Sequence, residues 1–282
     1  MSGIAEVLAN LGYEISGSDI QSNPATKKLE EIGCNISYTQ KAENVKGKQA
    51  VVVSSAINKN NPELQEARQQ KLLIVPRAEM LGELMRFRFG IASSGTHGKT
   101  TTTSLIVHIM TEAKLDPTYI IGGIINATGM NAKLGKSDYL IAEADESDAS
   151  FLHLQPMLSV ITNIDEDHMS TYNHSYDNLT DAFISFTSNL PFYGVCVACI
   201  DDDGVKDILK KIHRSVLSYG FSDDADVQAS NVKQNEMQMS FDVNCKKYQK
   251  KFHVSLNLIG RHNILNSLAA ISVAIELEIE LE

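Results

Sequence analysis

The chain has 282 residues, enough for two domains of ordinary size. Hydrophobic residues make up 43% and charged residues 21%, a balance that permits a sizeable buried core. The net charge of −10 argues against a broad nucleic-acid interface, because such interfaces gather positive charge. We therefore expect no nucleic-acid partner, although a small anionic ligand at one local site is still allowed.

No apolar run approaches the roughly 18 residues that a membrane span requires, so we expect no membrane insertion. The first six residues carry no basic segment ahead of an apolar stretch, and this predicts no secretory signal. A cytoplasmic location is the resulting expectation. The oligomeric state is left open by the sequence.

Residues 1–88 alternate between helical and strand patterns. The predicted helices are 2–11, 25–32, one opening at Asn61, and 78–85, and the predicted strands are 13–16, 34–38, 50–54 and 72–75. This alternation predicts a doubly wound, Rossmann-like α/β layer. Such a domain ordinarily opens with a strand and a Gly-rich turn, whereas this chain opens on the helix. We therefore expect that the first strand of this domain is missing.

A second α/β unit is predicted over residues 89–282, after a linker at residues 86–88. Its predicted strands are 89–93, 139–142, 158–161 and 194–200, and its predicted helices are 102–112, 177–189, 203–212 and 263–277. Between residues 227 and 254, apolar side chains alternate with polar ones, which predicts a small antiparallel sheet. Cys196 and Cys199 form a CxxC pair, but positions three apart on a strand face opposite ways, so no shared metal is expected.

The strongest functional signal is SGTHGKTTTT at residues 94–103, between a predicted strand and a predicted helix. Free backbone N–H groups at a helix N-terminus suit an anion, so this context predicts a phosphate-binding P-loop. Lys99 would reach the β- and γ-phosphates of a nucleotide, and the Thr100 hydroxyl would ligate Mg²⁺. The spacing departs from the common GxxxxGK[ST] pattern, since Ser93 takes the first glycine position. A chance Gly-Lys-Thr in a loop is the alternative.

Two acid-rich segments follow neighbouring predicted strands. Residues 143–148 begin with Glu143 and hold four acidic side chains, which predicts metal binding, with a solvated acidic loop as the alternative. Residues 162–168 end in His168, which is a candidate ligand of a second metal, although a lone histidine is more often structural. Two metals would stabilise phosphoryl charge better than one.

Asn263 and Asn266 lie three positions apart in the last predicted helix and therefore share a face. Their amides are able to bind a base edge. Alternatively, one amide caps the helix and the other packs in the core. The spacing does not decide between the two.

Four of these segments together resemble the Mur ligases: GTHGKTTTT (95–103), EADESDASFLHLQP (143–156), TNIDEDH (162–168) and GRHNILNSLAA (260–270). The resemblance covers the whole chain, and residues 145–156 are most similar to the branch that adds L-alanine. It implies three domains: a UDP-binding Rossmann-like domain, a P-loop ATPase domain and a C-terminal amino-acid-binding domain. By this resemblance, ATP phosphorylates the lactyl carboxylate of UDP-N-acetylmuramate, and L-alanine attacks the acyl phosphate to form an amide.

The resemblance also implies roles for individual residues. The triphosphate-binding residues would be Gly95, Thr96, His97, Gly98, Lys99, Thr100 and Thr101. Thr100 and Glu143 would hold one Mg²⁺ and His168 the second, so that Lys99, Glu143 and His168 are the catalytic set. The adenine contacts would be His262, Asn263 and Asn266, and weaker assignments for the UDP-sugar are Asp19, Ser54 and Ser55.

The chain departs from the family pattern in two ways. No lysine lies between His168 and Val205, so the carbamylated lysine of several members is not expected. The chain also ends where the ATPase domain finishes, and we therefore expect a fragment that cannot form product alone. Two rival functions stay open, namely a ligase that attaches a recycled tripeptide to the same sugar and an ATP-binding module without ligase activity.

Overall fold

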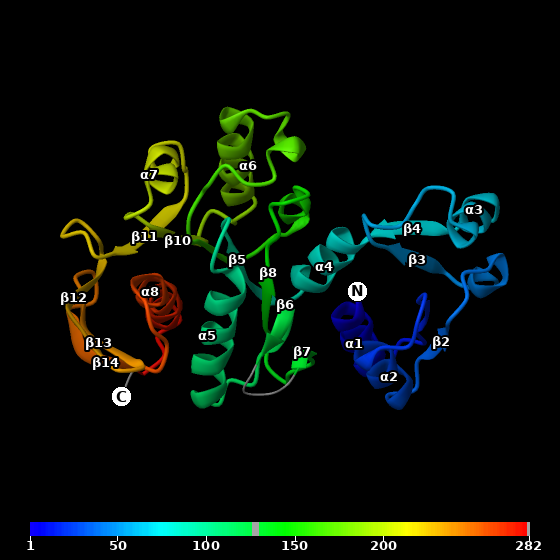
Figure 1. Cartoon of the computed structure of the whole chain (residues 1–282), viewed down its shortest axis with the longest axis horizontal. Coiled ribbons are helices and arrows are strands. Elements are labelled where there is room, and N and C mark those ends of the chain that lie inside the picture. The colour runs from blue at the N-terminus through cyan, green and yellow to red at the C-terminus, as the bar shows by residue number, and fades with distance from the viewer. Residues whose placement is uncertain (126–129, 281–282) are drawn as a thin grey trace.

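A computed structural model describes residues 1–125 and 130–280 of the chain. Figure 1 shows a large sheet with its helices in the centre and on the left, and two small sheets with their helices on the right. The small sheets belong to the first 76 residues, and the large sheet begins at Phe89. The helix that ends at Arg86 joins the two parts, at the place where the sequence predicts a linker.

The N-terminal part contains two separate pairs of parallel strands. The strands are β1 (Ser16–Ser18) with β2 (Asn35–Ser37), and β3 (Ala50–Val53) with β4 (Leu73–Pro76). The helices are α1 (Ser2–Asn10), α2 (Pro24–Glu31), the 3₁₀ turn η1 (Ala42–Val45), α3 (Pro62–Gln69) and α4 (Arg77–Arg86). Parallel pairing agrees with the predicted α/β alternation, but the described strands form two pairs instead of one continuous layer.

Local capping explains where these helices begin and end. The Asn23 side chain accepts from the amide of Thr26, and the Thr26 hydroxyl accepts in return from the amide of Asn23, so α2 begins with a capping box. Helix α1 ends in a turn at Gly12, whose φ of +93° favours glycine. Because this turn continues to Tyr13, the predicted strand at 13–16 was wrong, and β1 begins only at Ser16.

Ten strands of the described residues form one sheet in the order β14-β13-β12-β11-β10-β9-β5-β8-β6-β7. They are β5 (Phe89–Ser94), β6 (Thr118–Ile125), β7 (Met130–Lys133), β8 (Tyr139–Glu143), β9 (Leu158–Ile161), β10 (Val195–Cys199), β11 (Ser215–Gly220), β12 (Val227–Asn235), β13 (Gln238–Cys245) and β14 (Lys250–Leu256). The central pairs are parallel, and antiparallel pairing occurs only between β6 and β7 and among β12, β13 and β14 within the described part.

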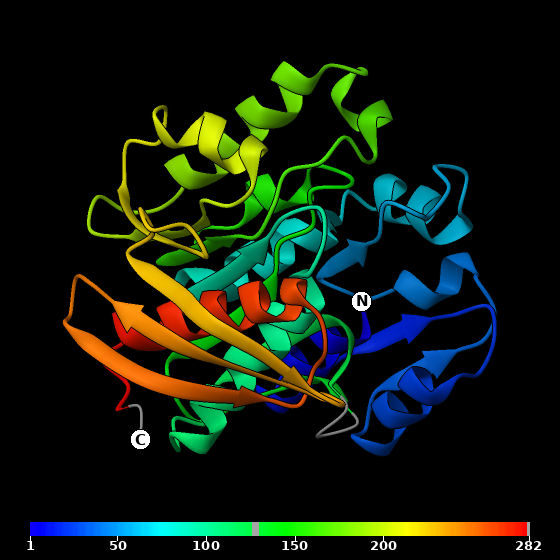
Figure 2. The same ribbon diagram turned by 60° about the vertical axis from the view of Figure 1, so that its left-hand side comes forward.

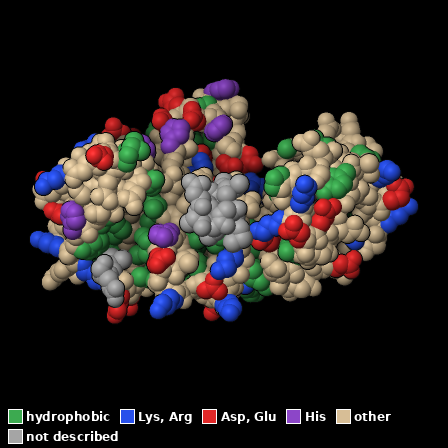
Figure 3. All heavy atoms as spheres, turned by 60° about the horizontal axis from the view of Figure 1, so that its bottom comes forward, with side chains coloured by type: hydrophobic (Ala, Val, Ile, Leu, Met, Phe, Trp, Pro, Cys, Tyr) green, Lys and Arg blue, Asp and Glu red, His purple; other side chains and the backbone are tan. Residues whose placement is uncertain are grey.

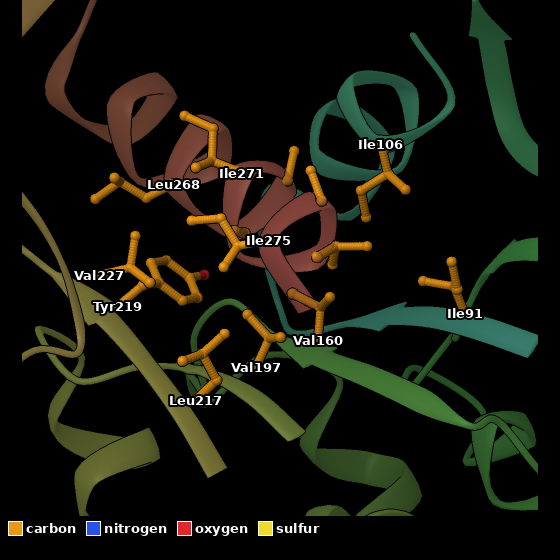
Figure 4. Packing of buried hydrophobic residues seen from close by; sticks show 14 of the residues in the cluster. Ile91, Ile106, Val160, Val197, Leu217, Tyr219, Val227, Leu268, Ile271 and Ile275 are labelled. Carbon is orange, nitrogen blue, oxygen red and sulfur yellow. The ribbon is translucent and has the colours of Figure 1, made fainter. Parts of the chain in front are cut away.

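Helices cover both faces of this sheet. They are α5 (Lys99–Glu112), α6 (Tyr176–Ser188), α7 (Asp203–Leu209) and α8 (Arg261–Glu276), with the 3₁₀ turns η2 (Ser150–His153) and η3 (Met169–Tyr172). On one face, α5 and α8 lie side by side and pack on alternate residues of the strands, as Figure 4 shows for Ile106, Ile275 and Val160. On the other face, α4, α6 and α7 cover a second buried cluster.

The two clusters confirm the period-two argument for the CxxC pair. Cys199 belongs to the cluster under α8, and Cys196 belongs to the cluster on the opposite face. Both thiols are buried, and burial raises the pKa of each to about 11. The pair therefore packs in the core and does not share a metal.

The C-terminal strands and three further strands differ from the sequence prediction. Strands β12–β14 are antiparallel as predicted, but β12 joins β11, so the predicted small sheet is the edge of the large one. Figure 2 shows these strands running beside α8, which they help to bury. Strands β6, β7 and β11 were not predicted. Strand β7 has only four residues, and β11 buries Leu217 and Tyr219 while its first residues are partly exposed.

The surface agrees with the charge composition. On the face drawn in Figure 3, lysine and arginine side chains are scattered among aspartate and glutamate. Across residues 1–125 and 130–280, every helix is too short or too polar to cross a membrane.

Candidate functional site

The site predicted from the P-loop lies at the carboxyl end of β5. This strand sits between β9 on one side and β8 on the other, and it is parallel to both. The connection after β5 leads through α5 to β6 on one side, and the connection after β9 leads through α6 to β10 on the other side. Such a divergence between neighbouring strands is the position where open α/β sheets bind ligands. The acid-rich segments after β8 and β9 flank the same edge.

The loop after β5 depends on two glycines. Gly95 has φ +128° and Gly98 has φ +84°, a region that other residues rarely adopt. A Cβ on Gly95 would lie 2.1 Å from Thr162 Oγ1, and one on Gly98 would lie 2.5 Å from Asn266 Oδ1. Gly98 is the N-cap of α5, so the predicted helix start at residue 102 was wrong, and Lys99, Thr100 and Thr101 already lie in its first turn.

The segment after β9 holds this loop in shape. The Thr162 hydroxyl lies 2.7 Å from the carbonyl oxygen of His97 and 3.2 Å from that of Ser94. The Asn163 side chain donates to the same His97 carbonyl at 2.9 Å and accepts from the His97 amide at 2.8 Å. The Thr96 amide donates to the Asn163 carbonyl at 3.1 Å. The loop therefore has a fixed shape before any ligand is bound.

The Lys99 ammonium lies inside the loop. Its Nζ lies 2.7 Å from the Gly95 carbonyl oxygen and 3.2 Å from that of Thr96. It also lies 2.9 and 2.8 Å from the two carboxylate oxygens of Glu146, a residue in the acid-rich segment after β8. The side chains of Lys99 and Glu146 are 18% and 4% exposed, so this ion pair is well shielded from water.

Glu143 ends β8 directly beside Ser93 of β5. Burial raises the pKa of the Glu143 carboxyl, outweighing the hydrogen bonds from the Thr100 side chain and the Gly122 amide that lower it. Its Oε1 atom is buried and has no hydrogen-bond partner in the described residues. A buried carboxylate oxygen without a partner, next to a threonine hydroxyl, fits a Mg²⁺ ligand pair.

No cluster of three or more His, Cys, Asp or Glu side chains suited to a metal occurs in the part of the chain that the structure describes. His168 lies at the start of η3 with φ +53°, and its side chain is exposed. Its role toward a second metal stays a prediction. Within the loop, His97 lies near two carboxylates, 3.9 Å from Asp165 and 3.7 Å from Asp167.

Asn263 and Asn266 share a helix face, as predicted from their spacing. Asn266 Nδ2 lies 3.3 Å from Asn263 Oδ1, and Thr102 Oγ1 lies 3.2 Å from Asn266 Oδ1. The buried Asn266 side chain thus fastens α8 to α5 directly behind Gly98. Asn263 is half-buried and donates to the Ile259 carbonyl, whereas His262 is exposed. Contacts of these three side chains with adenine stay a prediction.

The residues assigned to the UDP-sugar lie on loops of the N-terminal part. Asp19 accepts from the Ile20 amide and the Asn23 side chain, and Ser54 accepts from the Ala56 amide. Ser55 reaches the other part of the molecule, since its hydroxyl donates to Asp148 at 3.3 Å. Burial acts to raise the pKa of Asp148, but hydrogen bonds from Ser150 and Ser55 and the nearby Arg77 charge bring it below its usual value.

Three residues have clear structural roles that the sequence did not predict. Thr162, Asn163 and Glu146 lie inside the acid-rich segments, but the argument there concerned metal binding and not the P-loop. Their position after strands adjacent to β5 was the available signal, because the carboxyl ends of parallel neighbours meet at one edge.

Comparisons with known proteins agree with this arrangement. Residues 94–274 match the Mur ligase middle domain, and residues 1–89 match the Mur ligase family, catalytic domain. The chain is 66% identical over 280 residues to the UDP-N-acetylmuramate–L-alanine ligase of Vesicomyosocius okutanii subsp. Calyptogena okutanii (strain HA), covering 99% of this chain and 60% of that protein. It is 64% identical, with the same coverage, to the ligase of that name from Ruthia magnifica subsp. Calyptogena magnifica.

Solved structures share the fold. The UDP-N-acetylmuramate:L-alanyl-gamma-D-glutamyl-meso-diaminopimelate ligase from Neisseria meningitides has a TM-score of 0.88 at 25% identity, covering 98% of this chain and 90% of that one. The UDP-N-acetylmuramate-alanine ligase from Thermotoga maritima has a TM-score of 0.83 at 25% identity, covering 100% of this chain and 63% of that one. The chain spans about 60% of the length of the curated relatives that it matches. From the two domain matches, the chain belongs to the Mur ligase family.

Proposed function

We propose that this chain carries the UDP-sugar-binding and ATP-binding parts of a ligase that joins L-alanine to the lactyl carboxylate of UDP-N-acetylmuramate. Residues 1–88 would bind the UDP-sugar, and residues 89–282 would bind ATP. The two relatives at 66% and 64% identity, both named for this activity, support the choice of substrate. We assign the reaction to peptidoglycan precursor synthesis in the cytoplasm.

One observation carries the proposal: Lys99, at the start of α5 after the loop that follows β5, and Glu143, at the end of the adjacent parallel strand β8, lie around a loop already fixed in shape. Transfer of the γ-phosphoryl group needs charge neutralisation and positioning more than a side-chain nucleophile. Lys99 would neutralise phosphate charge, and the amides at the start of α5 would bind the phosphate oxygens. Thr100 and Glu143 would hold Mg²⁺, which supplies positive charge to the transferring phosphoryl group when it is bound.

The reaction sequence places two demands on the site. The lactyl carboxylate must reach the γ-phosphate in line, and the acyl phosphate must then last until the amine of L-alanine attacks it. The contact between Ser55 and Asp148 lies where the N-terminal part meets the acid-rich segment after β8. This contact supports a route by which a sugar held on the β3–α3 loop would reach the phosphate loop.

The test traps the acyl phosphate with hydroxylamine. The 282-residue chain and the product of the longest coding sequence that contains it are incubated separately with UDP-N-acetylmuramate, ATP and Mg²⁺. We expect a sugar hydroxamate that depends on both substrates. On addition of L-alanine, we expect amide formation by the longer product and none by the 282-residue chain alone. Absence of hydroxamate from both proteins, with ATP still hydrolysed, would support an ATP-binding module without ligase activity.

Competition between amino acceptors addresses the nearest rival function. The fold does not separate the two activities, because the tripeptide-type ligase from Neisseria meningitides matches this chain as well as the alanine ligase from Thermotoga maritima does. With L-alanine and the tripeptide L-alanyl-γ-D-glutamyl-meso-diaminopimelate at equal concentrations, we expect L-alanine to be incorporated. Preference for the tripeptide would overturn the assignment.

A further inference from the structure

The Lys99 ammonium has more acceptors than it has hydrogens. Four oxygen atoms lie within 3.2 Å of its Nζ: the carbonyl oxygens of Gly95 and Thr96 and both carboxylate oxygens of Glu146. A lysine ammonium has three N–H donors. Its hydrogen-bonding capacity is therefore already filled, and no donor is left for a phosphate oxygen.

Burial of its side chain and hydrogen bonds to the neighbouring backbone hold Glu146 in this position. Its side chain is 4% exposed, and the Tyr172 hydroxyl donates to its backbone carbonyl. In the next residue, the Ser147 carbonyl accepts from the Thr171 hydroxyl at 2.6 Å. Burial raises the pKa of the Tyr172 hydroxyl well above its ordinary value, so this donor keeps its proton. The segment that carries Glu146 is therefore anchored to η3.

The acceptor that has to be released is the carboxylate. The carbonyls of Gly95 and Thr96 belong to the loop that Thr162 and Asn163 hold in shape, so they cannot turn away without breaking those bonds. The Glu146 carboxylate ends a side chain with rotatable bonds, and it offers Lys99 two anionic oxygens, as a phosphate does.

We infer that Glu146 is a positioning residue that holds Lys99 inside the nucleotide-free loop and is exchanged for a phosphate oxygen when a nucleoside triphosphate binds. This inference rests on the proposed function, since it requires ATP in the loop. The carboxylate keeps the ammonium paired while the site is empty, so that a buried charge is never left alone. The same pairing lowers the affinity for the triphosphate, because the ion pair opens before Lys99 binds phosphate.

The test measures nucleotide affinity by calorimetry with a non-hydrolysable ATP analogue and Mg²⁺. In Glu146→Gln the amide keeps the shape and loses the charge, and we expect the analogue to bind about tenfold more tightly than to the wild type. In Glu146→Asp the charge stays, but the carboxylate is shorter by one methylene, and we expect roughly threefold tighter binding. Because the charge is unchanged there, removal of simple repulsion does not explain that gain.

Two controls isolate the exchange at Lys99. AMP has no β- or γ-phosphate, so its affinity should be the same for all three proteins. Lys28 and Glu6 form another shielded ion pair, at 2.8 Å with side chains 33% and 9% exposed, far along the chain from the loop. Glu6→Gln should lower the melting temperature as Glu146→Gln does and leave nucleotide affinity unchanged.

A crystal structure with the analogue gives the direct geometric readout. We expect the distance from Lys99 Nζ to both Glu146 carboxylate oxygens to exceed 4 Å, with a phosphate oxygen in their place. A persisting ion pair, or equal or weaker binding by both Glu146 variants, would overturn the inference and leave the proposed function standing. A wild-type chain that binds no triphosphate would contradict the proposed function and this inference together.

Discussion

The two parts of the molecule differ in how their loops are held. None of the residues in β1–β4 is fully buried, whereas every residue of β9 and β10 is buried between two helical layers. The side chains of Asp19 and Ser54 bond only to residues within four positions of themselves. The P-loop, in contrast, is bonded to residues 66 positions away.

This difference indicates which loops already have their binding conformation before a ligand is present. Bonds between distant segments fix the phosphate loop without a ligand, so its residues are already placed for charge stabilisation. The side chains of Asp19 and Ser54 have local bonds alone, whereas the Ser55 hydroxyl contacts Asp148. We therefore expect substitutions around β5 to have large effects and substitutions on the N-terminal loops to have small ones.

The largest effect is expected for Lys99→Ala. It removes the one charge that lies inside the loop, and ligase turnover should fall by about 100-fold to 1000-fold. Because the substitution also leaves Glu146 buried without its partner, the double variant with Glu146→Gln is measured alongside. Lys28→Ala, which breaks the Glu6 ion pair, is the matched control and should keep turnover. Near-normal turnover in Lys99→Ala would contradict the role of this lysine.

Gly95→Ala comes next, and it sharpens the comparison between the two parts. The new Cβ would lie 2.1 Å from Thr162 Oγ1, so the loop and the segment after β9 are forced apart. Gly12→Ala is the matched control, because Gly12 also has positive φ but has no atom within 4 Å of such a Cβ. Both variants pay about 1–3 kcal/mol of backbone strain in the free energy of unfolding. Only Gly95→Ala should also lose triphosphate affinity. Equal binding of the triphosphate by the two variants would contradict the role of Thr162 in holding the loop in its binding shape.

Glu143→Gln should stabilise the nucleotide-free protein at neutral pH. Since burial raises the pKa of Glu143, the folded state favours the protonated carboxyl, and stability falls as the pH rises from about 4.3, the ordinary pKa of glutamate, through the raised value. Glutamine removes this loss, so the melting temperature of the variant should exceed that of the wild type at pH 7 and approach it near pH 4. Glu79→Gln on the exposed side of α4 is the control. A variant less stable than the wild type at pH 7 would contradict the assigned burial cost.

The smallest effect is expected for Ser55→Ala. It removes one exposed bond at 3.3 Å to Asp148, which is worth less than about 1 kcal/mol of unfolding free energy. If this contact orients the sugar-side loop, the KM for UDP-N-acetylmuramate should rise a few-fold with kcat unchanged. Ser37→Ala, whose hydroxyl bonds to the nearby Thr39 and has no assigned role toward the sugar, is the control. A change in kcat would mean that the contact acts on the chemical step instead.

The sequence predicted the central sheet well, because buried parallel strands are continuous apolar runs. Strands β5, β8, β9 and β10 were located within one or two residues, and the opposite orientation of Cys196 and Cys199 followed from period two. Strand β7 has four residues, and in β11 the buried Leu217 and Tyr219 alternate with partly exposed residues over only a few positions. The separation of β1–β2 from β3–β4 is a tertiary property that local patterns do not encode.

The sequence predicted which segments form the site, but it did not predict which side chains pair with one another there. Motif spacing identified the loop and both acid-rich segments, and strand order brought them to one edge. The Lys99–Glu146 pair depends on which of four neighbouring acids turns inward, and that choice is made by the contacts of Tyr172 and Thr171. These contacts join segments that are 24 and 26 positions apart, so no local pattern shows them.

The most direct test of a phosphate loop fixed in shape before binding is amide hydrogen exchange with and without a non-hydrolysable ATP analogue and Mg²⁺. We expect slow exchange at His97, whose amide bonds to Asn163, in the nucleotide-free protein, and further protection over residues 98–101 when the analogue binds. Lys99→Ala should lose only the second protection. Fast exchange at His97 without nucleotide, or protection that appears elsewhere on the sheet, would contradict the account.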